Sequence, residues 1–343
     1  MQKKIVISGI RPTAEDQHLG NYLGAIRYFV ELARKEEYSC FFFVADLHAL
    51  TTCGSSFDAA GICRGRDAIV LNLLASGIDP QMSTIYTQSA VPEITELAWI
   101  LACLSRVHIL QDMHHWAEKK SALINLGIEA NAGLLTYPVL MAADILGLRA
   151  DVVPVGKDQH QHVEFARDLA RAFHRITGNA LFPVPDLHEQ QETTVKSLTR
   201  PKEKMGKSDP DGCLFLNDPP DVIGRKLGAA FTDPARKRRT DAGNPDGCNI
   251  YVLHQDISPS EDLVWAREGC QTASIGCRDC KSRLATHINT LLTPLRDRRQ
   301  QLEAQGADLV KSVLNDGNRR ARTRIAETVA AAKELMGLAL AVV

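Results

Sequence analysis

The fold is decided by residues 4–33, KIVISGIRPTAEDQHLGNYLGAIRYFVELA. The apolar run Lys4–Ser8 predicts a buried first strand, which ends in a glycine-containing loop over Gly9–Asp16. Apolar side chains then recur at helical spacing over residues 19–33, so we expect a helix there. The segment His18–Asn21 would therefore lie where a strand turns into a helix. At such a turn the free backbone N–H groups and the helix dipole favour phosphate, and a glycine lets a nucleotide approach closely.

The same alternation of strand and helix continues along the chain. Short apolar runs predict further strands over Cys40–Ala45, Ser83–Thr87 and Asp151–Val155. Apolar spacing predicts helices over Phe57–Ala75, from Pro92-Glu93 onward and over Gly133–Leu148. Strands that alternate with helices in this way form a doubly wound parallel sheet, so the expected fold class is α/β. The second strand delivers Asp46 and His48 to its carboxyl end, the ligand side of such a sheet.

A polar, turn-prone loop carries the next pattern, Lys204-Met205-Gly206-Lys207-Ser208. Its two ammonium groups lie three residues apart, so a moving loop can deliver point charges to phosphate oxygens. Taken alone, the stretch is also typical of a solvated lysine turn. In the same way, His18 and Asn21 alone are also typical of simple helix caps.

In combination, Pro12-Thr13 with His18–Asn21 and the loop Lys204–Ser208 resemble HIGH and KMSKS, the two signature motifs of class I aminoacyl-tRNA synthetases. The sequence departs from the first motif in two ways, because Ala14 replaces a glycine and one extra residue stands among positions 15–17. The resemblance implies a Rossmann-like catalytic domain with three catalytic residues, His18, Lys204 and Lys207. It also implies an ATP site formed by Arg11, Thr13, His18, Gly20, Asn21, Gly156, Asp158, Lys204, Met205, Lys207 and Ser208.

One carboxylate, Asp144, interrupts the almost wholly apolar stretch Gly133–Leu148. A charge in such a segment is costly unless something binds it. It is either structural, as a helix-end cap or an ion pair with Arg149, or an acceptor for a ligand donor. Residues 137–144, Tyr-Pro-Val-Leu-Met-Ala-Ala-Asp, resemble the substrate-binding helix of tryptophanyl-tRNA synthetases, in which the aspartate accepts the indole N–H. An indole nitrogen can only donate, so a carboxylate suits it.

The segment after the strand Asp151–Val155, Gly156-Lys157-Asp158-Gln159, is similar to the family pattern Gly-x-Asp-Gln, although Lys157 stands where the family often has glutamate. The resemblance implies that Gly156, Asp158 and Gln159 hold the ribose and the α-amino or carboxylate end of the amino acid. The implied tryptophan-binding residues are Ser8, His48, Tyr137, Met141, Asp144, Val153, Val155 and Gln159. His160 and His162 fall on different helix faces, so we expect no zinc between them.

After the lysine loop the sequence becomes helical and locally basic. The runs Arg236–Arg239 and Arg319–Arg324 are typical of solvated helix faces, but behind a synthetase-like half they also suit phosphate contacts to tRNA. We expect a catalytic domain over residues 1–215, with an inserted helical segment near residues 90–150. A helical domain over residues 216–343 would bind the tRNA anticodon, with its last helix packing back on the catalytic domain.

Four of the nine cysteines gather in this second half, at Cys248, Cys270, Cys277 and Cys280. Four thiolates can hold a tetrahedral zinc ion or a [4Fe–4S] cluster, and free thiols are the third alternative. Only the final C-x2-C has zinc-ribbon spacing. A subset of bacterial tryptophanyl-tRNA synthetases carries a very similar cysteine set with an iron–sulfur cluster. The resemblance therefore implies a [4Fe–4S] cluster here.

Composition limits the remaining possibilities. The 343 residues suggest two domains, and a hydrophobic content of 45% is ordinary for a globular chain. Because the net charge is -1, any polyanion would have to bind at local patches of positive charge. No apolar run reaches the ~18 residues of a membrane span. Nine cysteines without a signal peptide predict a reducing cytosol, and we place Cys40, Cys63 and Cys103 in the core.

The resemblance covers nearly the whole chain and implies a function. The family activates L-tryptophan with ATP and Mg²⁺ and transfers it to tRNA(Trp), as a cytoplasmic homodimer that acts on neither DNA nor membranes. Two other interpretations remain open. One is a sister class I enzyme that uses tyrosine, in which a Tyr/Asp pair would surround a phenol. The other is a non-enzymatic, RNA-binding regulator with a redox-sensing cluster, which would have no use for Lys204 and Lys207.

Overall fold

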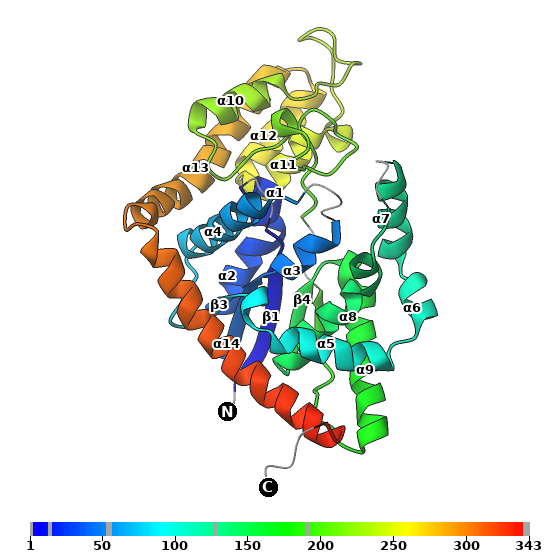
Figure 1. Cartoon of the computed structure of the whole chain (residues 1–343). Helices are drawn as coiled ribbons and strands as arrows, with labels where there is room; N and C mark the ends of the chain where they lie inside the picture. The colour runs from blue at the N-terminus through cyan, green and yellow to red at the C-terminus, as the bar shows by residue number, and fades with distance from the viewer. Residues whose placement is uncertain (1–2, 13–15, 53–56, 126–128, 190–192, 339–343) are drawn as a thin grey trace.

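Five parallel strands form the central sheet, in the order β3-β2-β1-β4-β5 (Figure 1). The computed structural model describes residues 3–12, 16–52, 57–125, 129–189 and 193–338. The strands are β1 (Lys4–Ile10), β2 (Tyr38–Val44), β3 (Thr84–Thr87), β4 (Val152–Val155) and β5 (Asp186–Glu189). β1 pairs with both β2 and β4, so the strand order reverses between β1 and β4. Ligands of such sheets bind outside the carboxyl ends of the strands at this switch point.

The doubly wound parallel sheet expected from the sequence is confirmed, and β1 to β4 lie where the apolar runs predict them. The strand β5 is missing from the prediction. Its sequence, Asp-Leu-His-Glu, is short and mostly polar, and it pairs only with β4 at the edge of the sheet. An edge strand has no need for the continuous apolar run that marks a central parallel strand.

Helices cover both faces of the sheet, which explains why its central strands are apolar on both sides. In β1, Val6 packs into one core cluster, and Ile5 and Ile7 pack into the other. The first cluster includes side chains from α2 (Arg27–Ala33) and α4 (Ala59–Ala75). The second includes side chains from α5 (Glu93–Leu104), α8 (Ala132–Gly147) and α9 (His160–Thr177). Between α5 and α8 the chain forms α6 (Val107–Gln111) and α7 (His114–Asn125).

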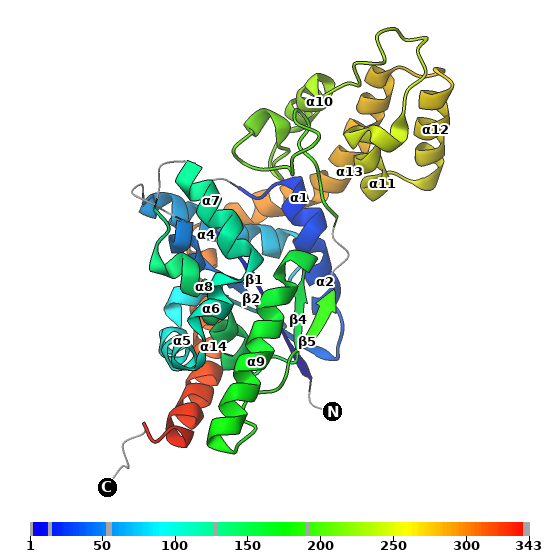
Figure 2. The ribbon, with the colours of Figure 1, turned by 90° about the vertical axis from the view of Figure 1, so that its right-hand side faces the viewer.

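Beyond residue 216 the described regular structure is helical. The helices are α10 (Pro220–Ala229), α11 (Asn249–Ile257), α12 (Ser260–Gln271), α13 (Cys277–Glu303) and α14 (Asp308–Leu335), with a 3₁₀ turn, η6 (Pro245–Gly247). Figure 2 shows α10, α11 and α12 to one side of the sheet, with α13 leading back from them. α13 contacts α4, and α14 contacts β3, α5 and α8. No helix in the described part of the chain is long and apolar enough to cross a membrane.

The last helix, α14, covers a free edge of the sheet, because β3 is the outermost strand on that side. A Cβ atom on Gly317 would lie 1.8 Å from the carbonyl oxygen of Ile85, so only glycine allows this close approach. The side-chain oxygen of Asn318 accepts a 2.8 Å hydrogen bond from the backbone N–H of Thr87. An open strand edge is a template for association with other chains, and α14 closes this one.

The arginine run Arg319–Arg324 belongs to the same contact. Arg320 donates to carbonyl oxygens in the loop before β3, and Arg324 donates to the carbonyl oxygen of the residue after α8. Arg322 pairs with a glutamate of α5. The sequence-based interpretation of this run as phosphate contacts is therefore wrong for Arg320 and Arg324, which fasten α14 to the loop before β3 and to the end of α8.

Two of the three cysteines expected in the core are exposed. Cys40 of β2 is buried, whereas Cys63 of α4 and Cys103 of α5 face solvent. Cys103 lies one helical turn beyond Trp99, whose exposed fraction is 73%. From Leu97 to Leu104 the sequence of α5 is apolar all round, so its pattern there does not distinguish the inner face from the outer one.

Candidate active site

A cavity of about 420 Å³ includes residues at the carboxyl ends of β1 and β4. Its walls contain all eight residues that the sequence predicts for tryptophan binding: Ser8, His48, Tyr137, Met141, Asp144, Val153, Val155 and Gln159. Arg11 and Asp158, predicted for ATP, line the same cavity. The side chains come from β1, α3 (Asp46–Ala49), α8, β4 and the 3₁₀ turn η4 (Lys157–Gln159), which the sheet brings together. That they bind a ligand remains a prediction.

Asp144 is the buried carboxylate of this cavity, with an exposed fraction of 1%. Its oxygens accept hydrogen bonds of 2.9 and 2.8 Å from Nε2 of Gln88, and one lies 3.0 Å from Nε2 of His48. Burial raises the pKa of Asp144, and the hydrogen bonds from His48 and Gln88 oppose that rise. The partners of Asp144 are therefore His48 and Gln88, and not Arg149, the ion-pair partner considered from the sequence. A carboxylate has about four lone-pair sites, so about one remains for a ligand N–H.

A buried histidine fixes the hydroxyl of Tyr137. The hydroxyl lies 2.8 Å from Nε2 of His162, and burial lowers the pKa of His162 to about 4, which keeps the imidazole neutral at pH 7. Nζ of Lys119 lies 4.4 Å from the centre of the Tyr137 ring, a cation–π distance. Since its hydroxyl is already bonded to His162, we expect Tyr137 to contact a ligand through its aromatic ring.

The turn before the first long helix has the geometry of a capping box. Nδ1 of His18 accepts from the backbone N–H of Asn21 at 3.3 Å, and Oδ1 of Asn21 accepts from the backbone N–H of His18 at 3.1 Å. Burial, followed by the charge of Lys207, lowers the pKa of His18 to about 4. A neutral imidazole whose Nδ1 is an acceptor carries its proton on Nε2, so His18 has a donor left for a ligand. A Cβ on Gly20 would lie 2.9 Å from the His18 ring, which explains the glycine.

The two signature motifs lie side by side, although they are far apart in sequence. The backbone N–H of Leu19 donates to the carbonyl oxygen of Leu214 at 2.8 Å, just beyond the lysine loop. Lys207 is close enough to His18 to lower the pKa of that histidine. The prediction that an N-terminal helix start and a distant basic loop act together therefore has a geometric basis.

The other residues predicted for ATP lie in several parts of the chain. Thr13 lies outside the described residues. Gly156 directly precedes η4, and the side chain of Met205, within the lysine loop, is buried in the core. Lys204 and Ser208 are exposed on that loop.

The sequence analysis misses one residue that holds Asp144 from behind the cavity and three polar residues that line the cavity itself. Gln88 donates to both oxygens of Asp144 and directly follows β3. Its position at the carboxyl end of a strand is the sequence signal that could have identified it. His115 and Lys119 reach the cavity from α7, and Thr51 reaches it from the segment after α3. The local sequence of α7 does not identify His115 and Lys119 as site residues. They become part of the site only because they line the same cavity as residues of β1, α8 and β4, which lie elsewhere in the sequence.

The four cysteines of the helical half line one pocket. Cys248 precedes α11, Cys270 lies in α12, and Cys277 and Cys280 begin α13. Among the described residues, no three histidine, cysteine, aspartate or glutamate side chains are placed to hold a single metal ion.

One arginine of the basic run Arg236–Arg239 belongs to this pocket. Nη1 of Arg236 lies 3.7 Å from Sγ of Cys270 and 3.6 Å from Sγ of Cys277, and its Nε donates to the carbonyl oxygen of Asp241. Arg236 is buried, whereas residues 237–239 are exposed. The run is therefore divided between a buried cation beside sulfur atoms and an exposed basic segment.

Similarity to known proteins assigns the fold and the site to a family. Residues 2–293 match the family described as tRNA synthetases class I (W and Y). The chain is 38% identical to the tryptophan–tRNA ligase of Deinococcus radiodurans, over 97% of this chain and 98% of that protein. It is 41% identical to the tryptophan–tRNA ligase of Treponema pallidum, over 97% of this chain and 96% of that protein.

The solved structures agree with these relatives. The tryptophanyl-tRNA synthetase of Campylobacter jejuni, complexed with ADP and tryptophan, gives a TM-score of 0.82 at 30% identity, over 97% of this chain and 100% of that one. The family description covers enzymes for both tryptophan and tyrosine, whereas these relatives are tryptophan enzymes. The similarities thus support neither the tyrosine enzyme nor the non-enzymatic regulator. The chain belongs to the tryptophanyl-tRNA synthetases, the tryptophan–tRNA ligases of class I.

Proposed function

We propose that this chain joins L-tryptophan to ATP in the cavity at β1 and β4, releases pyrophosphate and transfers the tryptophanyl group to tRNA(Trp). The observation that carries the proposal is the buried carboxylate of Asp144 in a cavity whose lining includes Met141 and Val153. Such a cavity suits a large aromatic ring that has one N–H donor. His48 and Gln88 hold the carboxylate in place, so it does not need to reorganise when the donor arrives.

The chemistry needs positioning rather than a general base. The carboxylate of tryptophan is ionised at neutral pH, so it can attack the α-phosphorus of ATP directly. We assign to His18 a neutral Nε2–H donor at the phosphates, and to Lys204, Lys207 and Ser208 the contacts with the departing pyrophosphate. Mg²⁺ enters with ATP and shares the negative charge of its phosphates. Fixed charges of this kind stabilise the transition state because they need no rearrangement.

The helical part is proposed to bind tRNA. We keep the predicted division into a catalytic domain over residues 1–215, with its helical insertion near residues 90–150, and an anticodon-binding domain over residues 216–343. The exposed segment Lys237–Arg239 supports this role, because exposed cations can meet phosphates; Arg239 also lies 3.6 Å from a carboxylate oxygen of Asp279.

We propose a homodimer, with a second copy of the chain covering the outer face of α5 and α6. The exposed fractions there are 73% for Trp99, 61% for Val107 and 39% for Ile109, and Cys103 lies among them. Exposed large apolar side chains on neighbouring helices are typical of an interaction site. Since its substrates are ATP, tryptophan and tRNA, we place the protein in the cytoplasm.

The cysteine pocket is proposed to hold a [4Fe–4S] cluster through Cys248, Cys270, Cys277 and Cys280. Two observations support the fit: the four side chains line a single pocket, and the buried cation of Arg236 lies beside two of the sulfur atoms. A cluster bound by four thiolates is anionic overall, so a neighbouring guanidinium favours it. The cluster would supply a covalent connection among α11, α12 and α13.

Amino-acid-dependent exchange between pyrophosphate and ATP tests the proposal. We expect exchange with tryptophan alone among the twenty amino acids, and aminoacylation of tRNA(Trp) at a rate that depends on the same cavity. Exchange driven by tyrosine would contradict the proposed substrate. Binding of tRNA without any exchange would contradict the proposed reaction.

A further inference from the structure

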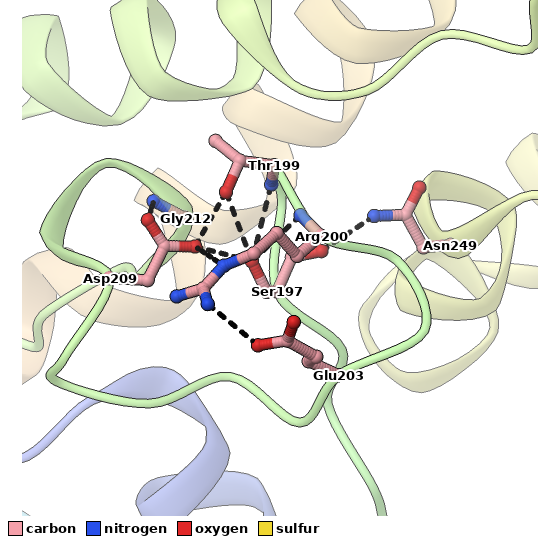
Figure 3. Close-up of polar contacts among 7 residues, drawn as sticks. All are labelled: Ser197, Thr199, Arg200, Glu203, Asp209, Gly212 and Asn249. Carbon is pink, nitrogen blue, oxygen red and sulfur yellow. Dashed lines mark hydrogen bonds and ion pairs between the residues drawn. The ribbon is translucent and has the colours of Figure 1, made fainter. Parts of the chain in front are cut away.

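The lysine loop is held at its base by one carboxylate, Asp209, which follows the loop directly. Oδ2 of Asp209 accepts from the hydroxyl of Ser197 at 2.8 Å, the hydroxyl of Thr199 at 2.5 Å and Nε of Arg200 at 3.2 Å (Figure 3). Its Oδ1 accepts from the backbone N–H of Gly212 at 3.3 Å. We call these five residues the Asp209 clasp. The hydrogen bonds from Thr199, Ser197 and Arg200 hold the pKa of Asp209 at about 2, so the carboxylate is ionised at pH 7.

The clasp is packed without spare room. A Cβ on Gly212 would lie 2.1 Å from Oδ2 of Asp209, 2.3 Å from the Ser197 hydroxyl and 2.6 Å from the Thr199 hydroxyl. A single methyl group at this position would therefore separate the carboxylate from its donors without changing any charge.

Backbone hydrogen bonds connect the clasp to the lysine loop. The N–H of Ser197 donates to the carbonyl oxygen of Glu203 at 3.0 Å, and the N–H of Asp209 donates to that of Gly206 at 3.1 Å. Lys204 and Lys207 thus lie on a short arch whose two ends Asp209 joins. A longer side chain or an absent carboxylate at the base would let the two ends separate, and the ammonium groups would move with them.

The clasp also reaches the helical half of the molecule. Nδ2 of Asn249, the first residue of α11, donates to the carbonyl oxygen of Ser197 at 2.9 Å, in a buried contact. Asn249 directly follows Cys248, one of the four cysteines of the pocket. The base of the lysine loop is therefore bonded to the segment that carries the first of these cysteines.

We propose that Asp209 is a positioning residue for adenylate formation, and that Asn249 makes the lysine loop move together with the helical half. The inference rests on the proposed contacts of Lys204 and Lys207 with pyrophosphate. Asp209 touches no substrate in this proposal. It fixes the distance between the loop ends, and so the places of the two ammonium groups relative to His18.

The first experiment compares Asp209→Ala with the matched control Asp211→Ala, which removes an exposed carboxylate two residues away. We expect Asp209→Ala to lower kcat for pyrophosphate exchange by about 10²-fold, the scale of an ångström-sized misplacement. Tryptophan affinity, measured by binding without ATP, should change less than about 2-fold, because the cavity is elsewhere. Asp209→Asn, which keeps the volume, should recover part of the loss. Asp211→Ala should behave as wild type.

A second readout is independent of catalysis. Trypsin cleaves after lysine, so its rate at Lys204 and Lys207 reports opening of the loop. We expect cleavage to be faster by at least about tenfold in Asp209→Ala and in Gly212→Ala, as local opening becomes more frequent. Unchanged cleavage with unchanged kinetics would overturn the proposal. A loss of tryptophan affinity and thermal stability in proportion to activity would also overturn it, since Asp209 would then be merely structural.

Lys207→Ala separates this inference from the proposed function. If Lys207→Ala lowers kcat for pyrophosphate exchange and Asp209→Ala leaves it unchanged, the proposed positioning role of Asp209 is refuted. The proposed role of Lys207 then stands. If Lys207→Ala has wild-type kcat for exchange while the Asp209 variants still show faster trypsin cleavage, the proposed role of Lys207 is refuted. Asp209 would then hold the loop closed without positioning a catalytic group.

Asn249→Ala tests the connection to the helical half. We expect a smaller fall in kcat, about tenfold, and no further fall when the change is added to Asp209→Ala, because both residues act through Ser197, Asn249 at its carbonyl oxygen and Asp209 at its hydroxyl. Additive losses would show that Asn249 and Asp209 act separately, and would overturn the coupling.

Discussion

Replacement of Asp144 should weaken tryptophan binding through one hydrogen bond. The three contacts from His48 and Gln88 leave about one lone-pair site for the indole N–H. A hydrogen bond to a charged group contributes about 1.5–3 kcal/mol. At 1.4 kcal/mol per factor of ten, Asp144→Asn or Asp144→Ala should raise KM for tryptophan by about 10- to 150-fold. Discrimination against phenylalanine, which has no such donor, should narrow by the same factor.

The alanine variant has a second effect, on the fold. It leaves two buried donors, Nε2 of His48 and Nε2 of Gln88, without their acceptor. At about 1–3 kcal/mol each, the free energy of unfolding should fall by about 2–6 kcal/mol. Asp144→Asn keeps one acceptor oxygen and the volume of the side chain, so it should be the more stable of the two variants.

The assay is pyrophosphate exchange with tryptophan and with β-(3-benzothienyl)alanine, in which sulfur replaces the indole N–H. Wild-type enzyme should prefer tryptophan, and the Asp144 variants should lose that preference. Met141→Leu is the control, since a residue that only packs against the ring should affect both substrates alike. Equal losses for both substrates in Asp144→Ala would refute the reasoning, because Asp144 would then support the fold without contacting the indole.

Three further predictions follow from the charges and burial described above. Lys207→Ala should lower the adenylation rate by ~10²-fold or more with tryptophan affinity unchanged, and wild-type exchange kinetics would contradict this role. Anaerobically purified protein should be brown and contain about four iron and four sulfide per chain. Cys277→Ser should lose that colour and impair tRNA charging more than adenylate formation. Replacement of the exposed Cys63 by serine should change neither the colour nor tRNA charging. Stoichiometric zinc without sulfide would contradict the cluster. Because the pKa of His162 is lowered from 6.5 to about 4, the neutral form stabilises the fold above pH 6.5, and the free energy of unfolding should fall as the pH drops from 6.5 toward 4. His162→Gln should make that fall shallower in denaturant titrations, and an unchanged slope would refute the assignment.

The sequence predicts the sheet and the cavity well because both depend on local patterns. An apolar run is enough to mark a central strand, and the ends of such strands meet at one edge of the sheet. Asp144 stands out for the same reason, since one charge in an apolar helix needs a partner wherever the helix packs. The signature motifs are short and contiguous, so their residues could be identified before the fold was known.

What the sequence does not predict depends on contacts between distant segments. The partners of Asp144 come from the ends of two strands, and no spacing rule connects Gln88 to α8. The run Arg319–Arg324 has the composition of a nucleic-acid contact, but two of its guanidinium groups bond to backbone carbonyl oxygens in the loop before β3 and at the end of α8. The burial of Arg236 beside Cys270 and Cys277 likewise depends on how the loop after α10 meets α12 and α13.

The position of α14 across β3 has a consequence for how the protein is made. β3 leaves the ribosome early, whereas the helix that covers its edge is synthesised more than two hundred residues later. Throughout that interval the nascent sheet presents unpaired backbone groups to any neighbouring chain, which makes this edge a place for chaperones to act. A product that stops before Asp308 keeps the lysine loop and every predicted cavity residue, yet lacks the cover of its sheet. We expect such incomplete chains to aggregate or to be degraded before they can charge tRNA.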